Sequence, residues 1–152
     1  MHEIKIHSAD FDSPVVRALL AEVLAELAER YGGPGDQTPV DAAEFRPPTG
    51  DFLVADDGER LIGCAGWRAH GPDAELKRMF TTKAARGQGL GRRLLVAVEE
   101  SARAAGCPRL VLETGTKQPE AIALYQSAGY TRIPDFGFYQ GAPDVLSFAK
   151  VL

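Results

Sequence analysis

The sequence predicts a single α+β domain over residues 1–152, in which a mixed, mostly antiparallel sheet carries helices on both faces. Three observations predict this class. Segments with alternating apolar residues indicate strands, and segments with apolar residues three and four positions apart indicate helices. Short turns join three consecutive strand segments, which is typical of antiparallel neighbours. A strand, a long helix and another strand then follow one another, and such a crossover favours one parallel pair.

The predicted elements follow the order β-α-β-β-β-α-β-α-β-β. They are a strand at residues 3–7, a helix at 14–30, strands at 51–55, 60–69 and 75–81, a helix between residues 86 and 106, a strand at 109–113, a helix between residues 119 and 129, and strands at 130–133 and 145–151. Ser13 and Pro14 are typical of a helix start. Residues 34–50 are expected to form a loop with a short helix at residues 40–45. The final strand is expected at an edge of the sheet.

A glycine-rich turn separates the strand at residues 75–81 from the long helix. Its residues are Arg86, Gly87, Gln88, Gly89, Leu90 and Gly91. The first turn of a helix has backbone N–H groups without internal partners, and the helix dipole adds positive charge there. Glycines let the backbone approach a phosphate closely. Because residues 76–98 contain six basic and no acidic residues, we expect this turn to bind a pyrophosphate.

Two common phosphate-binding motifs do not fit this turn. A P-loop requires Lys-Ser or Lys-Thr after its glycines, and neither is present. A dinucleotide fingerprint requires a third glycine where this chain has Arg92. These departures disfavour a nucleotide-binding regulator, which would bind ATP or NAD.

The turn does match the pattern Arg/Gln-x-x-Gly-x-Gly/Ala, through Arg86, Gly89 and Gly91. A second pattern, Ala-x-x-Leu-Tyr followed by Gly-Tyr, runs from Ala121 to Tyr130. In these two motifs, in their spacing and in its predicted element order, the chain resembles the GNAT superfamily of acetyl-CoA-dependent N-acetyltransferases. The resemblance covers nearly the whole chain.

The resemblance implies a GNAT fold and direct acetyl transfer from acetyl-CoA to a primary amine of a small molecule or amino compound. A protein lysine or an N-terminal amine is the alternative acceptor. A coenzyme A-binding sensor without catalysis is the alternative from another class. The family also implies that two copies can pair, so a homodimer is expected.

The transfer reaction needs a base, a group that polarises the carbonyl and a group that stabilises the leaving thiolate. Glu75 is similar in position to the strand glutamate that serves as general base in some relatives, and Glu113 or a water chain is the alternative. In the family, a bulge in this strand exposes a backbone N–H to the acetyl oxygen, so the resemblance implies that the N–H near Met79 is the oxyanion donor. The apolar alternation falters there, which agrees with a bulge. Tyr125 corresponds to the tyrosine that protonates the thiolate, or it only donates a hydrogen bond to the sulfur.

The same resemblance assigns the cofactor site. Its expected residues are Met79, Phe80, Thr81 and Gln118 beside the pantetheine arm, Arg86, Gly87, Gln88, Gly89, Leu90, Gly91 and Arg92 around the pyrophosphate, and Tyr125 near the sulfur. Gln118 stands where many relatives carry asparagine. Both side chains are amides, so a similar contact is expected.

Composition excludes several other classes. The formal net charge of −4 divides into −9 for residues 1–75 and +5 for residues 76–152, so most of the surface would repel nucleic acid. No apolar run approaches the ~20 residues of a membrane span, and no signal peptide is recognisable, so a cytoplasmic protein is expected. Cys64 and Cys107 are expected to be reduced thiols without a catalytic role. His2, His7 and His70 lack metal-ligand spacing.

The acceptor pocket is the part that the sequence specifies least. The aromatic-rich loop at residues 135–141 is a plausible pocket wall. Trp67, Phe138 and Tyr139 are its candidate lining residues, although a core position is the more common one for a residue such as Trp67.

Overall fold

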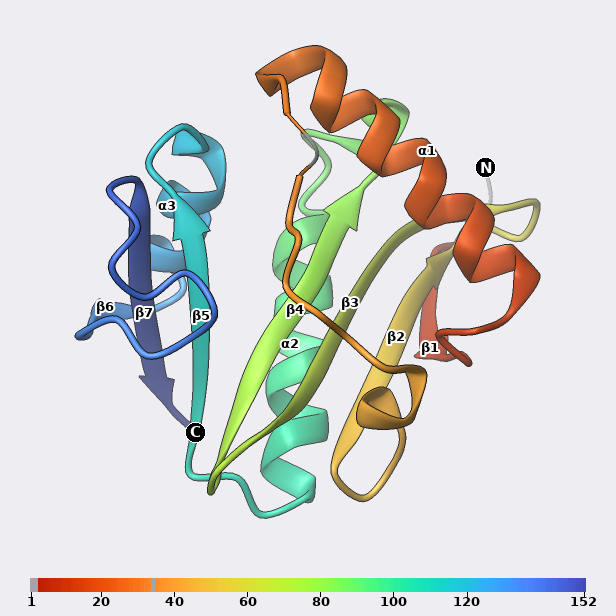
Figure 1. The fold of residues 1–152 in the computed structure, drawn as a ribbon. Helices are drawn as coiled ribbons and strands as arrows, with labels where there is room; N and C mark the ends of the chain where they lie inside the picture. Colours follow the sequence, from red (N-terminus) through yellow and green to blue (C-terminus); the bar gives the residue numbers. More distant parts are fainter. Residues whose placement is uncertain (1–2, 34) are drawn as a thin grey trace.

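The computed structural model describes residues 3–33 and 35–152 and contains a seven-stranded sheet with the order β1-β2-β3-β4-β5-β7-β6 (Figure 1). The strands are β1 (Lys5–Ser8), β2 (Gly50–Asp56), β3 (Leu61–His70), β4 (Asp73–Thr81), β5 (Arg109–Gly115), β6 (Thr131–Arg132) and β7 (Val145–Val151). Only β4 and β5 are parallel neighbours. The predicted class and element order are confirmed. His2 and Pro34 lie outside the described residues.

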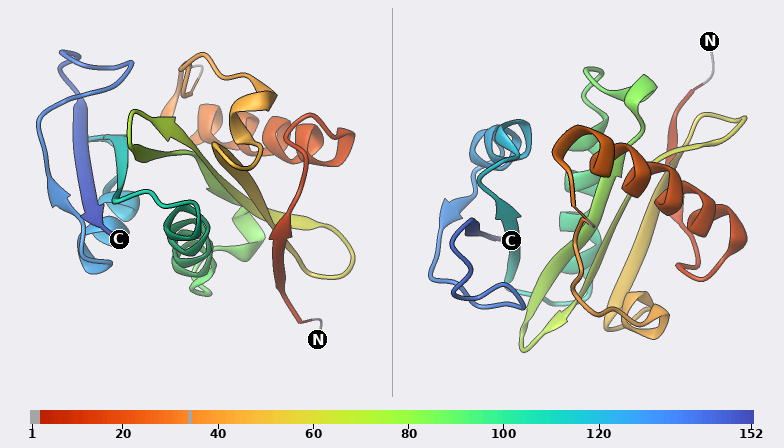
Figure 2. Two further views of the ribbon diagram at one scale, coloured as in Figure 1. Left: turned by 90° about the horizontal axis from the view of Figure 1, so that it is seen from below. Right: turned by 45° about the horizontal axis from the view of Figure 1, so that its top comes forward.

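Helices cover both faces of the sheet, as predicted (Figure 2). They are α1 (Pro14–Tyr31) on one face and α2 (Leu90–Ala104) and α3 (Pro119–Ser127) on the other, with short 3-10 helices η1 (Ala42–Phe45) and η2 (Lys83–Ala85). The Ser13 side chain accepts a hydrogen bond from the Val16 N–H and Pro14 occupies the first turn of α1, which confirms the predicted helix start.

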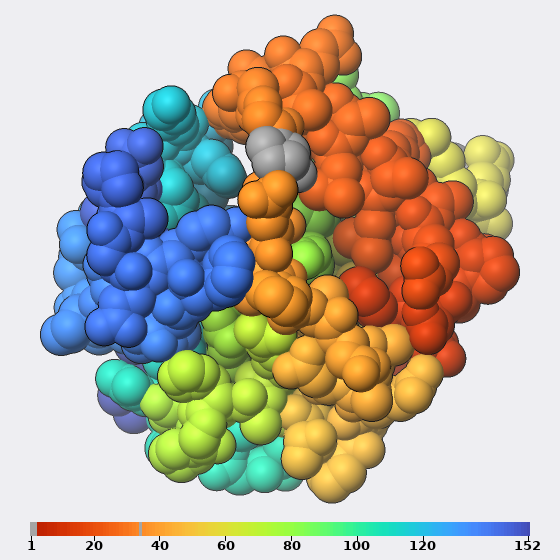
Figure 3. Space-filling model, viewed as in Figure 1, coloured from red at the N-terminus to blue at the C-terminus, as the bar shows by residue number. Residues whose placement is uncertain are grey.

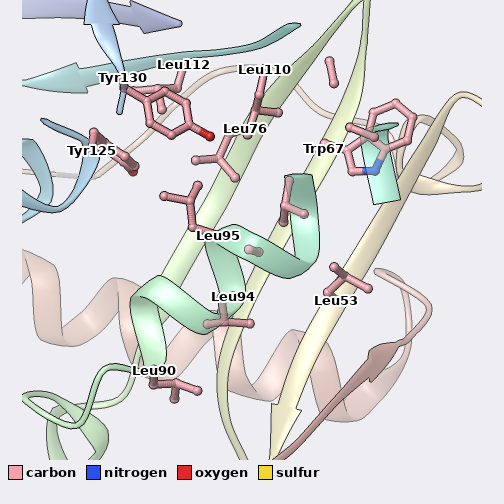
Figure 4. Close-up of a cluster of buried hydrophobic side chains, with 14 of the residues drawn as sticks. Leu53, Trp67, Leu76, Leu90, Leu94, Leu95, Leu110, Leu112, Tyr125 and Tyr130 are labelled. Atoms are coloured by element: carbon pink, nitrogen blue, oxygen red, sulfur yellow. The ribbon is translucent and has the colours of Figure 1, made fainter. Parts of the chain in front are cut away.

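The larger core lies between α2, α3 and the sheet (Figure 4). Leu90, Leu94, Leu95 and Val98 recur at helical spacing on α2, and all four are buried. Burying such a side chain contributes about 1.5–3 kcal/mol. This core fixes the first turn of α2, and therefore the glycine turn, against the sheet.

Strand β4 is irregular in the way that the sequence predicted. Its register with β3 passes from Lys77 opposite Gly66 to Phe80 opposite Cys64, so that Arg78 and Met79 lie opposite a single β3 residue. This two-against-one arrangement is a β-bulge. On its other side, β4 pairs with β5 only at Ala74 and Glu75. The two strands then diverge, as Figure 1 shows.

One expectation was wrong. The final strand is not at an edge, because β7 lies between β5 and β6, and β6 is the edge strand. Trp67 belongs to the core, the place that the sequence favoured for it, and its Nε1 donates to Ser101 Oγ at 2.8 Å. Across residues 3–33 and 35–152, no helix is long and apolar enough to span a membrane.

Candidate functional site

A cavity of about 550 Å³ lies where β4 and β5 diverge. Its walls include Met79 and Phe80 of β4, Leu112, Glu113 and Thr114 of β5, Tyr125 of α3 with Gln118 just before this helix, and Asp36 and Tyr139 from two loops. Residues 35–41 cross in front of β4, and we call this segment the strap. It meets the loop of residues 133–144 over the cavity (Figure 3).

A second hollow of about 480 Å³ continues from this cavity to the glycine turn. Met79, Phe80 and Gln118 line both spaces. The second hollow also contains most of the predicted cofactor residues, namely Thr81, Arg86, Gly87, Gly89, Leu90, Gly91 and Arg92. Tyr125 lines only the first of the two spaces. Gln88 lines neither, and its side chain donates to the Ala84 carbonyl.

The glycine turn has the geometry of an anion site. Gly87 and Gly89 have φ values of 78° and 77°, which favour glycine over any residue with a Cβ. The space beside both glycines is open. Gly89 caps α2 without a side-chain hydrogen bond, so the first N–H groups of the helix have no capping side chain. These features fit the pyrophosphate of coenzyme A.

The arginines around this turn have protein partners. Arg86 forms an ion pair with Glu26 of α1, and Arg92 donates to Ser127 Oγ. A phosphate that enters the turn would therefore compete with Glu26 for the Arg86 guanidinium.

The acceptor end of the cavity contains a buried cluster of charges around Lys77. Its Nζ lies 3.5 Å from both Glu75 Oε2 and Asp36 Oδ2, and 3.9 Å from Glu113 Oε1. It also donates to Thr38 Oγ1 at 2.9 Å. One ammonium group thus links β4, β5 and the strap.

The two candidate bases differ in their surroundings. Glu75 is held from the other side by Arg68 Nε at 3.1 Å, and it does not line the cavity. Glu113 does line the cavity. One oxygen of each carboxylate, Glu75 Oε2 and Glu113 Oε1, is buried without a hydrogen-bond partner. Burial raises the pKa of Glu113 above its ordinary value, although Lys77 and the Tyr139 N–H act in the opposite direction. Of the two carboxylates, Glu113 is therefore the one on the cavity wall.

The strap and the 133–144 loop meet at Asp36. Asp36 Oδ1 accepts from the Tyr139 hydroxyl at 3.1 Å, and that hydroxyl also accepts from the Gln37 N–H at 2.6 Å. Burial acts to raise the pKa of Asp36, but Lys77, Thr38 and Arg78 together hold it below its ordinary value. Asp36 is therefore ionised at neutral pH.

Tyr125 projects from α3 into the region between its helix and β5 and is almost fully buried (Figure 4). Burial raises the pKa of its phenol well above the ordinary value. The phenol stays protonated at neutral pH, and it can donate a hydrogen bond to an anion in the cavity.

Four other candidates from the sequence, Cys64, Phe138, His7 and His70, do not line the cavity. Cys64 is fully buried in the core, and burial raises the pKa of its thiol to about 12. Phe138 is 54% exposed. No cluster of three or more metal-ligating side chains occurs in the described part of the chain, which includes His7 and His70.

Sequence reasoning missed Asp36, Thr38 and Arg78. Asp36 and Thr38 lie in the loop that was least patterned, and Arg78 was taken only as part of the basic segment. The faltering alternation at Met79 marked the bulge itself, but no local signal identified the strap residues that contact it.

The sequence of this chain is similar to those of known proteins. Residues 20–130 match the sequence model described as Acetyltransferase (GNAT) family. The IAA acetyltransferase of Azospirillum brasilense is 39% identical over 142 residues, which cover 90% of each chain.

Solved structures show the same fold. A Klebsiella pneumoniae protein superposes with a TM-score of 0.80 at 31% identity, covering 98% of this chain and 97% of that one. A GNAT family acetyltransferase from Elizabethkingia anophelis, solved with acetyl-CoA bound, has a TM-score of 0.69 at 21% identity and 98% coverage of both chains.

The burial of Cys64 gives a testable prediction about thiol reactivity. The Cys107→Ser variant, which keeps only Cys64, should react with a thiol-specific reagent only when unfolded, because a buried thiol of raised pKa supplies almost no thiolate. The matched Cys64→Ser variant keeps the more exposed Cys107 and should react in the native state. Rapid native reaction of Cys64 would contradict the structure.

Proposed function

Since this chain belongs to the GNAT family of acetyl-CoA-dependent N-acetyltransferases, we propose that it acetylates the primary amine of a small molecule by direct attack on the thioester. The observation that carries the proposal is the cavity between β4 and β5, which continues to the glycine turn. A carboxylate, Glu113, and a phenol, Tyr125, both line it.

The shape of the cavity supports a small acceptor. The strap contacts the 133–144 loop through Asp36, Gln37 and Tyr139, so a bridge of protein crosses the acceptor end. An extended polypeptide would have to displace this bridge, whereas a small amine would not. The 39%-identical relative is named an IAA acetyltransferase, and that name also favours a small acceptor.

Glu113 is the proposed proton acceptor. A primary amine is protonated at neutral pH, because its pKa is about 10 as for lysine. A carboxylate with a raised pKa is better matched to this proton than an ordinary glutamate. Lys77 forms ion pairs with both Glu113 and Glu75. Because Glu75 does not line the cavity, we assign it only the role of an ion-pair partner of Lys77.

The other two roles fall to Met79 and Tyr125. The backbone N–H at Met79 lies in the β4 bulge and is the proposed donor to the acetyl oxygen. Tyr125 is the proposed donor to the sulfur as negative charge develops there. Since its pKa is raised far above the ~8.5 of a thiol, hydrogen bonding is favoured over complete proton transfer.

Direct attack is supported by the positions of the two thiols. Neither Cys64 nor Cys107 lines the cavity, and burial raises the pKa of both. A covalent acyl-enzyme on cysteine would require a reactive thiolate in the site.

The experiment that tests the proposal is release of free coenzyme A from acetyl-CoA over a panel of small primary amines, with a lysine-containing peptide of similar charge as the control. Faster turnover of a small amine than of the peptide is expected. Faster turnover of the peptide would favour a protein acceptor. Binding of acetyl-CoA without turnover of any amine would favour a sensor domain.

Replacing Glu113 gives a prediction with a defined pH dependence. Glu113→Gln should lower kcat by about 10²–10⁴-fold, which is the usual contribution of a general base. In the wild type, kcat should fall as the pH drops through the raised pKa of Glu113, because only the carboxylate accepts a proton. This acid limb should be absent from the variant.

Glu75→Gln is the matched control for this measurement. It changes a carboxylate that contacts the same Lys77 but does not line the cavity. It should reduce stability while retaining the acid limb. If Glu75→Gln removes the limb and Glu113→Gln retains it, the two assignments must be exchanged.

Replacing Tyr125 tests the role of its phenol. Tyr125→Phe should lower kcat by about 10–10²-fold with little change in KM for acetyl-CoA, since one hydrogen bond made mainly in the transition state is lost. Tyr130→Phe is the control, because the neighbouring Tyr130 hydroxyl donates to Glu99 instead. It should lower thermal stability and leave kcat nearly unchanged. Equal losses of kcat in both variants would contradict the assignment.

A further inference from the structure

Arg78 adopts an unusual backbone conformation. Its φ is 57°, and among residues 3–33 and 35–152 it is the only residue other than glycine with a positive φ. Left-handed backbone is unfavourable for a residue with a Cβ, so it persists only where neighbouring contacts hold it. Arg78 lies in the β4 bulge, immediately before Met79.

The side chain of Arg78 is held by the strap. Its Nη1 lies 2.7 Å from Asp36 Oδ2, and its Nη2 donates to the Thr38 carbonyl at 3.0 Å. The guanidinium-bearing side chain is only 10% exposed. A partly buried pair with such geometry is stronger than an exposed surface ion pair.

The main chain of Arg78 is held from the opposite direction. Its carbonyl accepts a hydrogen bond from Cys64 Sγ of β3 at 3.2 Å. Strand β3 therefore fixes the carbonyl while the strap fixes the side chain.

Asp36 is itself fixed by other groups. Its Oδ1 accepts from the Thr38 N–H at 2.9 Å, from Thr38 Oγ1 at 2.6 Å and from the Tyr139 hydroxyl at 3.1 Å. The carboxylate that holds Arg78 is thus anchored to the strap and to the 133–144 loop.

We propose that Asp36 is a positioning residue for acetyl transfer, which acts through Arg78 to hold the left-handed bulge and thereby to aim the Met79 N–H at the acyl carbonyl. The proposal rests on the proposed function, in which that N–H is the oxyanion donor. Asp36 itself contacts no reacting atom in this role. Its carboxylate defines the direction in which the next peptide group points.

The proposal makes a distinction between alanine and glycine at position 78. Both substitutions remove the guanidinium, but only glycine adopts a positive φ without a supporting contact. Arg78→Ala should therefore relax the bulge and lower kcat by at least about tenfold, a part of the 10²–10³-fold that a lost oxyanion donor costs. Arg78→Gly should keep kcat within about threefold of wild type.

A double-mutant cycle tests the link to Asp36. Asp36→Asn, which is nearly isosteric, should lower kcat by about tenfold in the wild-type background and by less than about twofold in the Arg78→Gly background, because coupled residues are not additive. Binding of coenzyme A, measured by thermal shift, should change little. Asp41→Asn, at the other end of the strap, is the control, since Asp41 caps η1 and should leave kcat unchanged.

Amide hydrogen exchange at residues 78–80 provides a readout that does not depend on turnover. Asp36→Asn should accelerate this exchange by at least about tenfold in the wild-type background and not in the Arg78→Gly background. Unchanged exchange, or equal kcat losses in Arg78→Ala and Arg78→Gly, would overturn the proposal. A rise in KM for the amine alone would overturn it too, and would make Asp36 an acceptor ligand.

The two proposals can fail separately. If no amine is turned over but the exchange pattern is as expected, the proposed function fails while the bulge is still held by Asp36. If amines are turned over and the exchange pattern is absent, the positioning role fails alone.

Discussion

The divergence of β4 from β5 is the constraint on which the site depends. These strands share only two register pairs, at Ala74 with Leu110 and Glu75 with Val111. Beyond them, two inner strand edges present backbone groups that a regular sheet would pair. A ligand arm with amides can pair with such an edge as an added strand. Because the opening lies inside the sheet, the same divergence creates both the binding edge and the cavity.

Such an opening must be stabilised by contacts other than ladder hydrogen bonds. At the acceptor end, Lys77 lies among the carboxylates of Asp36, Glu75 and Glu113. Removing one partner of a buried ion pair costs about 3–5 kcal/mol, because the other charge stays buried. The cluster therefore supports the diverging strands as a unit. It also leaves Glu113 on the wall of the cavity.

The parts that the sequence predicted depend on local patterns. The glycine turn, the start of α1 and the bulge at Met79 each follow from neighbouring residues, whose spacing determines backbone conformation. The choice between Glu75 and Glu113 could not be made in this way. Both residues end up around Lys77, and only the diverging strands decide which of them faces the cavity. The place of β7 inside the sheet was mispredicted because strand order depends on contacts distant in sequence.

The half of the site that would bind coenzyme A (the donor half) and the half that would bind the acceptor (the acceptor half) differ in the same way, in how far apart their residues lie in the sequence. The donor half is formed by consecutive residues of β4, the turn and α2, so a short motif is sufficient to identify it. The acceptor half joins residues that are far apart in the chain, 42 positions from Asp36 to Arg78 and 103 from Asp36 to Tyr139. Loops accept substitutions more readily than the scaffold does. The strap and the 133–144 loop can therefore change the acceptor while the donor half is retained. If Asp36 holds the bulge as proposed, a change in the strap alters catalysis as well as acceptor choice.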